Sequence, residues 1–264
     1  KHSGKLNTLL FRPSVIYGIS DKLNLMLSTR IGFRSMIWDQ KGNSIHHRSE
    51  STFQGFDNAN PSWLGDSKIV LRYLFKNDGM GDGLRFIYGG GISVPSNSVL
   101  TSDPFFLQGE EKSDHRHFSL SSGNYKYVIE TQLFFKQQEN PVFYGGFLTY
   151  EHPIQENKYN YLAPPLLNLS LSATFKRFDE RDSSLGYGLG ILQSGHGYWN
   201  GVKEPNSKSL SVSPTLSYLV NSQFGALSFN ISKPYFLRGA FNTNEGDIGQ
   251  GSNIWQFTVS IRKV

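Results

Sequence analysis

Basic side chains recur at even spacing within apolar segments, and this spacing is the most informative chemical feature of the sequence. Arg30 and Arg34 are four residues apart, and so are Lys68 and Arg72. In an extended strand, residues separated by an even number of positions point to the same face. A row of such cations attracts carboxylates or phenolates and repels cations, as charged rings do in pores. The spacing therefore predicts an anion-attracting face on a sheet.

Three stretches with histidine raise metal binding as an alternative: "HHR" at 46–48, "DHRH" at 114–117 and "GHG" at 195–197. Adjacent histidines usually point apart, and none of these spacings matches an established metal site. We interpret them as solvated loop histidines and expect neither a metal nor another cofactor. The stretch "NDGMGDG" at 77–83 has oxygen ligands but lacks the distal glutamate of an EF-hand, so we interpret it as a glycine-rich turn.

Composition excludes several classes of protein. The chain has 264 residues, 38% of them hydrophobic and none of them cysteine, so disulfides and thiolate chemistry are absent. No apolar run approaches the roughly 18 residues of a membrane-spanning helix. The net charge of +5 comes from dispersed basic residues without interleaved aromatics, so nucleic acid is not an expected partner.

Apolar residues alternate with polar ones along most of the chain. Leu23, Leu25 and Leu27 share one face of an extended segment, whereas Arg30 and Arg34 lie on the other. About eleven segments of this kind approach the roughly 10 residues of a tilted membrane strand. We place them near 6–17, 23–38, 67–76, 84–95, 125–137, 142–151, 165–178, 185–194, 208–219, 225–233 and 253–264.

The connections alternate between short and long, which distinguishes two all-β folds. Short turns such as 20–22, 77–83 and 137–141 alternate with long polar segments. This is the pattern of an outer-membrane barrel, with short periplasmic turns and long extracellular loops, and a soluble β-sandwich does not require it. We expect one domain over 1–264: a transmembrane antiparallel up-and-down β-barrel in the bacterial outer membrane. Its long loops are expected near 39–66, 96–124, 152–164, 195–207 and 234–252.

Eleven strands cannot close such a barrel, because the first and last would run in the same direction. We therefore expect about 12 strands, with one missing before Lys1 or, less favoured, hidden in the loop at 96–124. Pro13 and Pro214 each remove a ladder donor within a predicted strand. We expect β-bulges at both positions.

Several stretches resemble a known family. "YGISDKLNLML" at 17–27, "WLGDSKIVLRYLF" at 63–75 and "GGGISVPS" at 89–96 are similar to the outer-membrane transporters linked to the meta-pathway of phenol degradation. These are distantly similar to fatty-acid-channel barrels. The resemblance implies a pore-forming uptake protein for small, often aromatic or hydrophobic compounds.

Strand parity predicts which polar residues line the lumen and thus the path of a solute. They are Arg12, Arg30, Arg34, Lys68, Arg72, Arg85, Lys126, Glu130, Gln132 and Lys176. The expected function is passive uptake of small anionic or amphipathic solutes, with outer-membrane lipid around the barrel and Arg30 and Arg34 as selectivity residues. If the barrel is instead closed and anchors or encloses a protein partner, the basic residues pair with Glu130, Glu151 and loop carboxylates. The sequence leaves both hypotheses open.

Catalysis is the third hypothesis, because some outer-membrane barrels are lipid hydrolases with a Ser/His pair. His117 and Ser119 have an H-x-S spacing that places both side chains on one face of an extended segment. The serine lies in a predicted long loop and lacks the Asn-Gly that follows it in outer-membrane phospholipases. We therefore do not expect an enzyme.

Overall fold

The computed structural model describes residues 4–38, 49–79, 81–105, 115–176, 183–205, 207–223, 225–239 and 254–263. Within these ranges, all the regular secondary-structure elements are β-strands. No helix in this part of the chain is long and apolar enough to cross a membrane. The strands are β1 (Gly4–Phe11), β2 (Ser14–Gly18), β3 (Leu23–Trp38), β4 (Glu50–Ser51), β5 (Leu64–Asn77), β6 (Gly83–Val94), β7 (Lys126–Lys136), β8 (Phe143–Pro153), β9 (Tyr161–Leu162), β10 (Leu166–Lys176), β11 (Ser183–Ser194), β12 (Tyr198–Trp199), β13 (Val202–Lys203), β14 (Ser209–Ser222), β15 (Gly225–Ser232), β16 (Tyr235–Arg238) and β17 (Gln256–Arg262).

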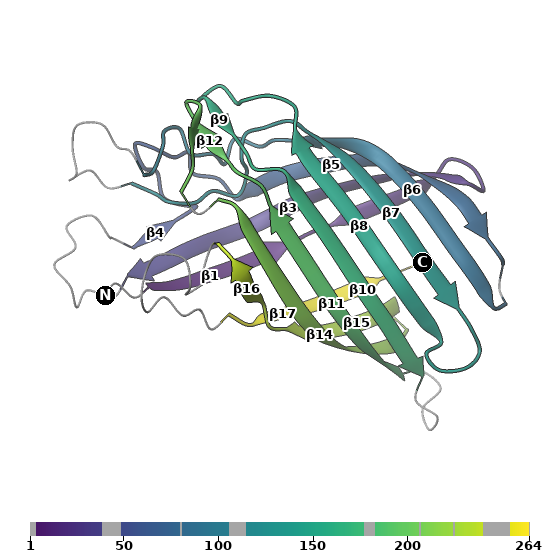
Figure 1. Ribbon diagram of the computed structural model, residues 1–264. Helices are drawn as coiled ribbons and strands as arrows, with labels where there is room; N and C mark the ends of the chain where they lie inside the picture. The colour runs from purple at the N-terminus through teal and green to yellow at the C-terminus, as the bar shows by residue number, and fades with distance from the viewer. Residues whose placement is uncertain are drawn as a thin grey trace.

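The long strands form one antiparallel sheet of up-and-down topology that curls into a barrel (Figure 1). Its order is β1-β3-β5-β6-β7-β8-β10-β11-β14-β15-β17, while β2 extends the edge along β3 and β16 pairs with β14. Each predicted segment corresponds to one strand of this path, with β1 and β2 together forming the first. The predicted fold class is confirmed.

The two edges of the sheet are β1, extended by β2, and β17. Among the described residues, no backbone pairing joins these edges. They run in the same direction because each of the ten steps between them is antiparallel. The strand expected before Lys1 therefore stays a prediction.

Exposure distinguishes the two faces of the strands. In β5, Ile69, Leu71 and Phe75 are 40%, 44% and 69% exposed, whereas Val70 between them is fully buried. A soluble sandwich would bury its apolar face, so these exposed side chains contradict that alternative. An outward apolar face alternating with a polar inner face is the arrangement of a membrane barrel.

Pro13 separates β1 from β2 and Pro214 lies within β14, and neither produces the expected bulge at its own position. Phe11 pairs with Ile31 and Ser14 with Ser28, so the register is the same on either side of Pro13. The carbonyl of Pro13 still accepts from Thr29 N at 3.2 Å, which keeps the strands aligned without the missing N–H. Pro214 likewise stays in register with β11, and its carbonyl accepts from Lys233 N at 3.3 Å.

The long connections fold together at one end of the barrel, where Figure 1 shows β4, β9 and β12, and the short turns lie at the opposite end. Strands β9, β12 and β13 form a separate three-stranded sheet within these loops. Ala59, Val99, Leu120 and Trp199 are at most 4% exposed there. We call the described loop residues 49–63, 95–105, 115–125, 154–165 and 195–205 the loop cap. A second apolar cluster, Met26, Val70 and Val128, lies on the inner face of the sheet.

Candidate functional site: the polar interior of the barrel

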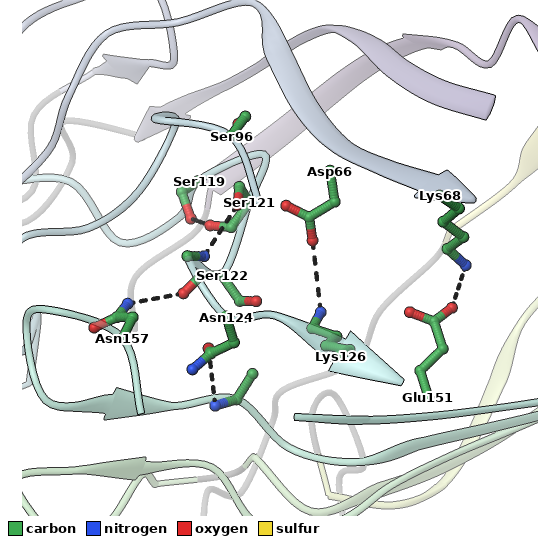
Figure 2. A network of polar contacts seen from close by, with 12 residues as sticks. Asp66, Lys68, Ser96, Ser119, Ser121, Ser122, Asn124, Lys126, Glu151 and Asn157 are labelled. Carbon is green, nitrogen blue, oxygen red and sulfur yellow. Dashed lines mark hydrogen bonds and ion pairs between the residues drawn. The ribbon is translucent and has the colours of Figure 1, made fainter. Parts of the chain in front are cut away.

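Three ion pairs cross the concave face of the sheet. Lys68 pairs with Glu151, Arg72 donates from Nε to Oε2 of Glu130 at 2.8 Å, and Lys126 Nζ lies 3.6 Å from Oδ2 of Asp66. Strands β5 and β8 are separated by β6 and β7, so Lys68 and Glu151 can meet only on the inner side of the curved sheet. Figure 2 shows the pairs of Asp66 with Lys126 and of Lys68 with Glu151.

Small residues on β6 make these contacts possible. In the sheet register, Gly89 lies between Arg72 on β5 and Glu130 on β7. A Cβ on Gly89 would lie 3.1 Å from Cγ of Arg72, which shows that the arginine side chain crosses directly over this residue. Ser93 occupies the equivalent position between Lys68 and Lys126. Long basic side chains can therefore reach carboxylates two or three strands away.

Arg12, Arg30 and Arg34 form a second group of cations, which we call the arginine cluster. Arg30 is close enough to repel both Arg12 and Arg34 electrostatically. Within the described part of the chain, none of the three forms an ion pair with a carboxylate, although Glu151 attracts Arg12 at longer range. Nε of Arg30 and Nε of Arg34 are buried without an acceptor among these residues. These two N–H donors are therefore unsatisfied within the described part of the chain.

The arginine cluster lies against the loop cap. Nη1 of Arg34 donates to the carbonyl of Ser119 at 3.5 Å. A Cβ on Gly65 would lie 3.0 Å from the Leu120 carbonyl oxygen and 3.1 Å from Cβ of Arg30. Because residue 65 is glycine, the loop and the arginine side chain can both approach β5 closely.

The other predicted lumen residues lie elsewhere on their strands. Arg85 donates from Nε to the Asn77 side chain at 3.1 Å, in the turn between β5 and β6. Lys176 is exposed at the end of β10, where its backbone exchanges two hydrogen bonds with the Asn140 side chain. Gln132 follows Glu130 on the same face of β7 and pairs in register with Ile87 and Phe147. The structure does not bring these three into the ion pairs or the arginine cluster.

The inner face of the second half of the barrel has a different composition. Its small residues come from three adjacent strands: Ser170 and Ser172 on β10, Gly186, Gly188 and Gly190 on β11, and Ser213, Thr215 and Ser217 on β14. Ser170 and Ser172 are exposed, whereas Glu130 and Val128 across the barrel are 4% and 1% exposed. The interior is therefore closely packed and charged along β3 to β8, and lined by small polar residues along β10 to β14.

The loop cap contains a buried arginine that sequence reasoning missed. Arg116 is fully buried, and its guanidinium donates to the backbone carbonyls of Ser51, Gln54 and Asn60 at 3.2, 3.2 and 2.7 Å. Burial lowers the pKa of Arg116 to about 10, and the charge of Glu50 partly opposes this effect. No periodic pattern in the loop sequence distinguishes this arginine from a solvated one.

The proposed catalytic and metal-binding groups have other partners. Nδ1 of His117 pairs with Oε1 of Glu50 at 2.9 Å, and the hydroxyl of Ser119 donates to the carbonyl of Ser121 at 2.5 Å. The stretch 46–48 and residue 114 lie outside the described residues. Among those that are described, no three histidine, aspartate or glutamate side chains are grouped to hold a metal ion.

A buried tyrosine and carboxylate lie in another part of the cap. The hydroxyl of Tyr161 donates to Oε2 of Glu204 at 3.0 Å, and the Tyr161 ring centre lies 4.5 Å from that of Trp199. Burial raises the pKa of Glu204, with a smaller increase from the charge of Asp103, although the hydrogen bond from Tyr161 acts in the opposite direction. Burial also raises the pKa of Tyr161. This pair is a candidate for pH-dependent behaviour of the cap.

Comparison with known proteins supports the fold. No protein-family model matches the sequence, and no curated protein matches it. The structure is similar to the crystal structure of an outer membrane channel from Pseudomonas putida F1, with a TM-score of 0.56 and 11% sequence identity. The match covers 88% of this chain and 78% of that channel. At this identity the similarity shows a common fold, an antiparallel up-and-down β-barrel.

Proposed function

We propose that the protein is a channel of the bacterial outer membrane that passes small anionic solutes. The observation that carries this proposal is the difference between the two groups of cations in the interior. Lys68, Arg72 and Lys126 each have a carboxylate partner, whereas the arginine cluster has none among the described residues. The cluster is therefore the surplus positive charge that a diffusing anion would meet.

The solute class follows from the chemistry of guanidinium groups. Carboxylates and phenolates accept charge-assisted hydrogen bonds from arginine, and the guanidinium groups of Arg30 and Arg34 have no carboxylate partner among the described residues. Small aromatic acids fit this chemistry and the resemblance to transporters of aromatic compounds. Met26 and Val70 also lie on the inner face of the barrel. They pack against Val128 and are nearly or fully buried, so they offer a passing solute little apolar surface.

Ion selectivity in a planar bilayer tests the proposal. Across a potassium chloride gradient, we expect the full chain to conduct with a reversal potential that indicates anion preference. Replacing Arg30 and Arg34 together by glutamine should lower the anion-to-cation permeability ratio at least about threefold, because two interior charges are lost. In liposomes, small aromatic acids should enter faster than neutral sugars of similar size.

A matched control removes two charges from the short turns. Lys22 and Lys76 are exposed, so replacing both by glutamine should leave the permeability ratio almost unchanged. Conduction with unchanged selectivity in the Arg30→Gln/Arg34→Gln variant would contradict anion guidance by the cluster. Folded protein that does not conduct would contradict the channel itself.

A closed barrel that anchors or encloses a protein partner is the second candidate function. The folded loop cap favours it, because Arg116 is fully buried there and the cap contacts the arginine cluster at one end of the barrel. A closed barrel predicts no conductance from folded protein, together with a stoichiometric partner that remains bound after detergent extraction. An anion-selective conductance would contradict this alternative.

A further inference from the structure

A lysine lies between two aromatic rings on the outer face of the barrel. Nζ of Lys233 is 5.1 Å from the ring centre of Trp255 and 5.6 Å from that of Tyr235. The amide of Lys233 donates to Pro214 O, so the strand alternation of β15 continues through this residue. Its neighbour Ser232 has the opposite orientation and contacts the Gln256 side chain at 3.3 Å. Lys233 and Trp255 therefore point to the same side as the exposed apolar residues of β15 and β17.

The surroundings of this lysine are apolar and exposed. On β17, Phe257 and Val259 are 74% and 67% exposed, and Phe229 on β15 is 46% exposed. These side chains form the lipid-facing surface expected of a membrane barrel. A lysine among them cannot be solvated by hydrocarbon, so its ammonium group must reach the headgroup region.

The position along the strand agrees with this requirement. Lys233 directly follows β15, an eight-residue strand that starts at the short turn. At about 3.3 Å per residue and a tilt of about 40°, Lys233 lies roughly 20 Å above that turn. The apolar band of a membrane barrel is about 25 Å high, so the lysine is near the edge of the band on the side of the loop cap.

We propose that Lys233, Tyr235 and Trp255 form a binding site for the phosphate of an anionic lipid headgroup. The ammonium group has three N–H donors, and no described carboxylate forms an ion pair with it. Tyrosine and tryptophan are the residues that occupy the interface between headgroups and hydrocarbon, and their rings also hold the lysine by cation–π contact. The site depends on the barrel's fold and not on the channel proposal.

Lipid binding by the detergent-purified full chain tests this site. The probes are phosphatidylglycerol, which is anionic, phosphatidylcholine, which is zwitterionic, and inorganic phosphate. Native mass spectrometry should show phosphatidylglycerol bound in preference to phosphatidylcholine. Lys233→Ala should lower phosphatidylglycerol binding about fivefold, the effect of one lysine near an anionic lipid surface. Lys233→Arg should retain it, because the charge and the contact with the rings are kept.

Two further variants separate this site from general effects. Lys158 has a similar contact with a ring, 5.0 Å from the centre of Tyr159, but it belongs to the loop cap. Lys158→Ala should therefore bind phosphatidylglycerol as the unaltered chain does. Trp255→Leu should weaken binding while keeping the lysine, which also tests the site if Lys233→Ala does not fold. Equal binding by the Lys233→Ala, Trp255→Leu and unaltered proteins would overturn the proposal, and so would equally tight binding of inorganic phosphate.

Discussion

Asn58 and Arg116 hold each other through two hydrogen bonds, although 58 residues separate them in the sequence. The Asn58 side chain donates from Nδ2 to the Arg116 carbonyl at 2.9 Å and accepts from the Arg116 amide at 2.8 Å. The guanidinium of Arg116 in turn binds three carbonyls of the loop that contains Asn58. Two long loops are thus joined into one unit above the arginine cluster.

Asn58→Ala should open this unit without unfolding the barrel. The substitution leaves a buried amide and a buried carbonyl without partners, which should destabilise the cap by about 2 kcal/mol. Trypsin cleavage after Arg116 is the measurement, because the buried arginine of the unaltered chain should resist the protease. Asn221→Ala, at an exposed position near a short turn, is the control. Equal resistance of Asn58→Ala and the control would contradict the joined loops.

Glu204 should make the cap pH-dependent. Its raised pKa means that the protonated form is favoured in the folded cap. The resulting stability is fully present below the unfolded value of about 4.5 and is lost as the pH rises through the folded value. The fluorescence of Trp199, which packs on Tyr161, should therefore change with increasing pH above about 4.5.

Glu204→Gln separates this effect from other titrations. Glutamine keeps an acceptor for the Tyr161 hydroxyl but does not ionise, so the fluorescence of this variant should not change over the same range. Glu156→Gln, at an exposed site, should keep the transition of the unaltered chain. Subtracting the signal of a Trp199→Phe variant isolates the reporter from the other tryptophans. If the fluorescence transition persists in the Glu204→Gln variant, the titration of another group causes it.

Glu130→Gln should destabilise the barrel and increase its anion preference. The side chains of Arg72 and Glu130 are 13% and 5% exposed, so the substitution leaves a buried cation without its partner. Loss of one member of such a pair costs about 3 kcal/mol, which should lower the melting temperature. The added surplus charge should shift the reversal potential in the direction opposite to Arg30→Gln/Arg34→Gln. Arg72→Met/Glu130→Leu should recover most of the stability, and equal melting of all three proteins would contradict a buried pair.

Neighbouring glycines on β6 should differ sharply in their tolerance of alanine. A Cβ on Gly91 would lie 2.0 Å from the Ile69 carbonyl oxygen, whereas a Cβ on Gly90 would meet nothing within 4 Å. Gly91→Ala should therefore destabilise the barrel by about 2 kcal/mol through overpacking, and Gly90→Ala should not. Thermal unfolding followed by circular dichroism compares them. Equal melting temperatures would contradict the close approach of β5 and β6.

The fold was predictable because a membrane barrel repeats one simple pattern. Alternation in segments such as Ile69 to Phe75 and the alternating loop lengths were sufficient to predict every long strand. Strand β16 lies in a segment that was expected to be a loop. The sequence does not indicate this strand because it is short and follows Pro234. Strands β4, β9, β12 and β13 have two residues each, so tertiary packing and not local periodicity determines them.

Strand parity predicts the face on which an interior residue lies but not its partner. The contact between Arg72 and Glu130 depends on a register that aligns both with Gly89. Asp66, the partner of Lys126, lies at the end of a segment expected to be loop, although it has the same parity as Lys68. The burial of Arg116 could not be predicted, because the packing of long loops follows no periodic pattern in the sequence.

The division of the interior has a consequence for engineering this barrel as a nanopore. Charge is concentrated on β3 to β8, where basic and acidic side chains interlock, and the small residues of β10 to β14 form no part of that network. Larger side chains at Ser170 or Ser172 would narrow the bore without disturbing the ion pairs. Substitutions in the arginine cluster would change its charge without changing the opposite wall. In the proposed channel, pore width and ion preference could thus be adjusted by separate sets of mutations.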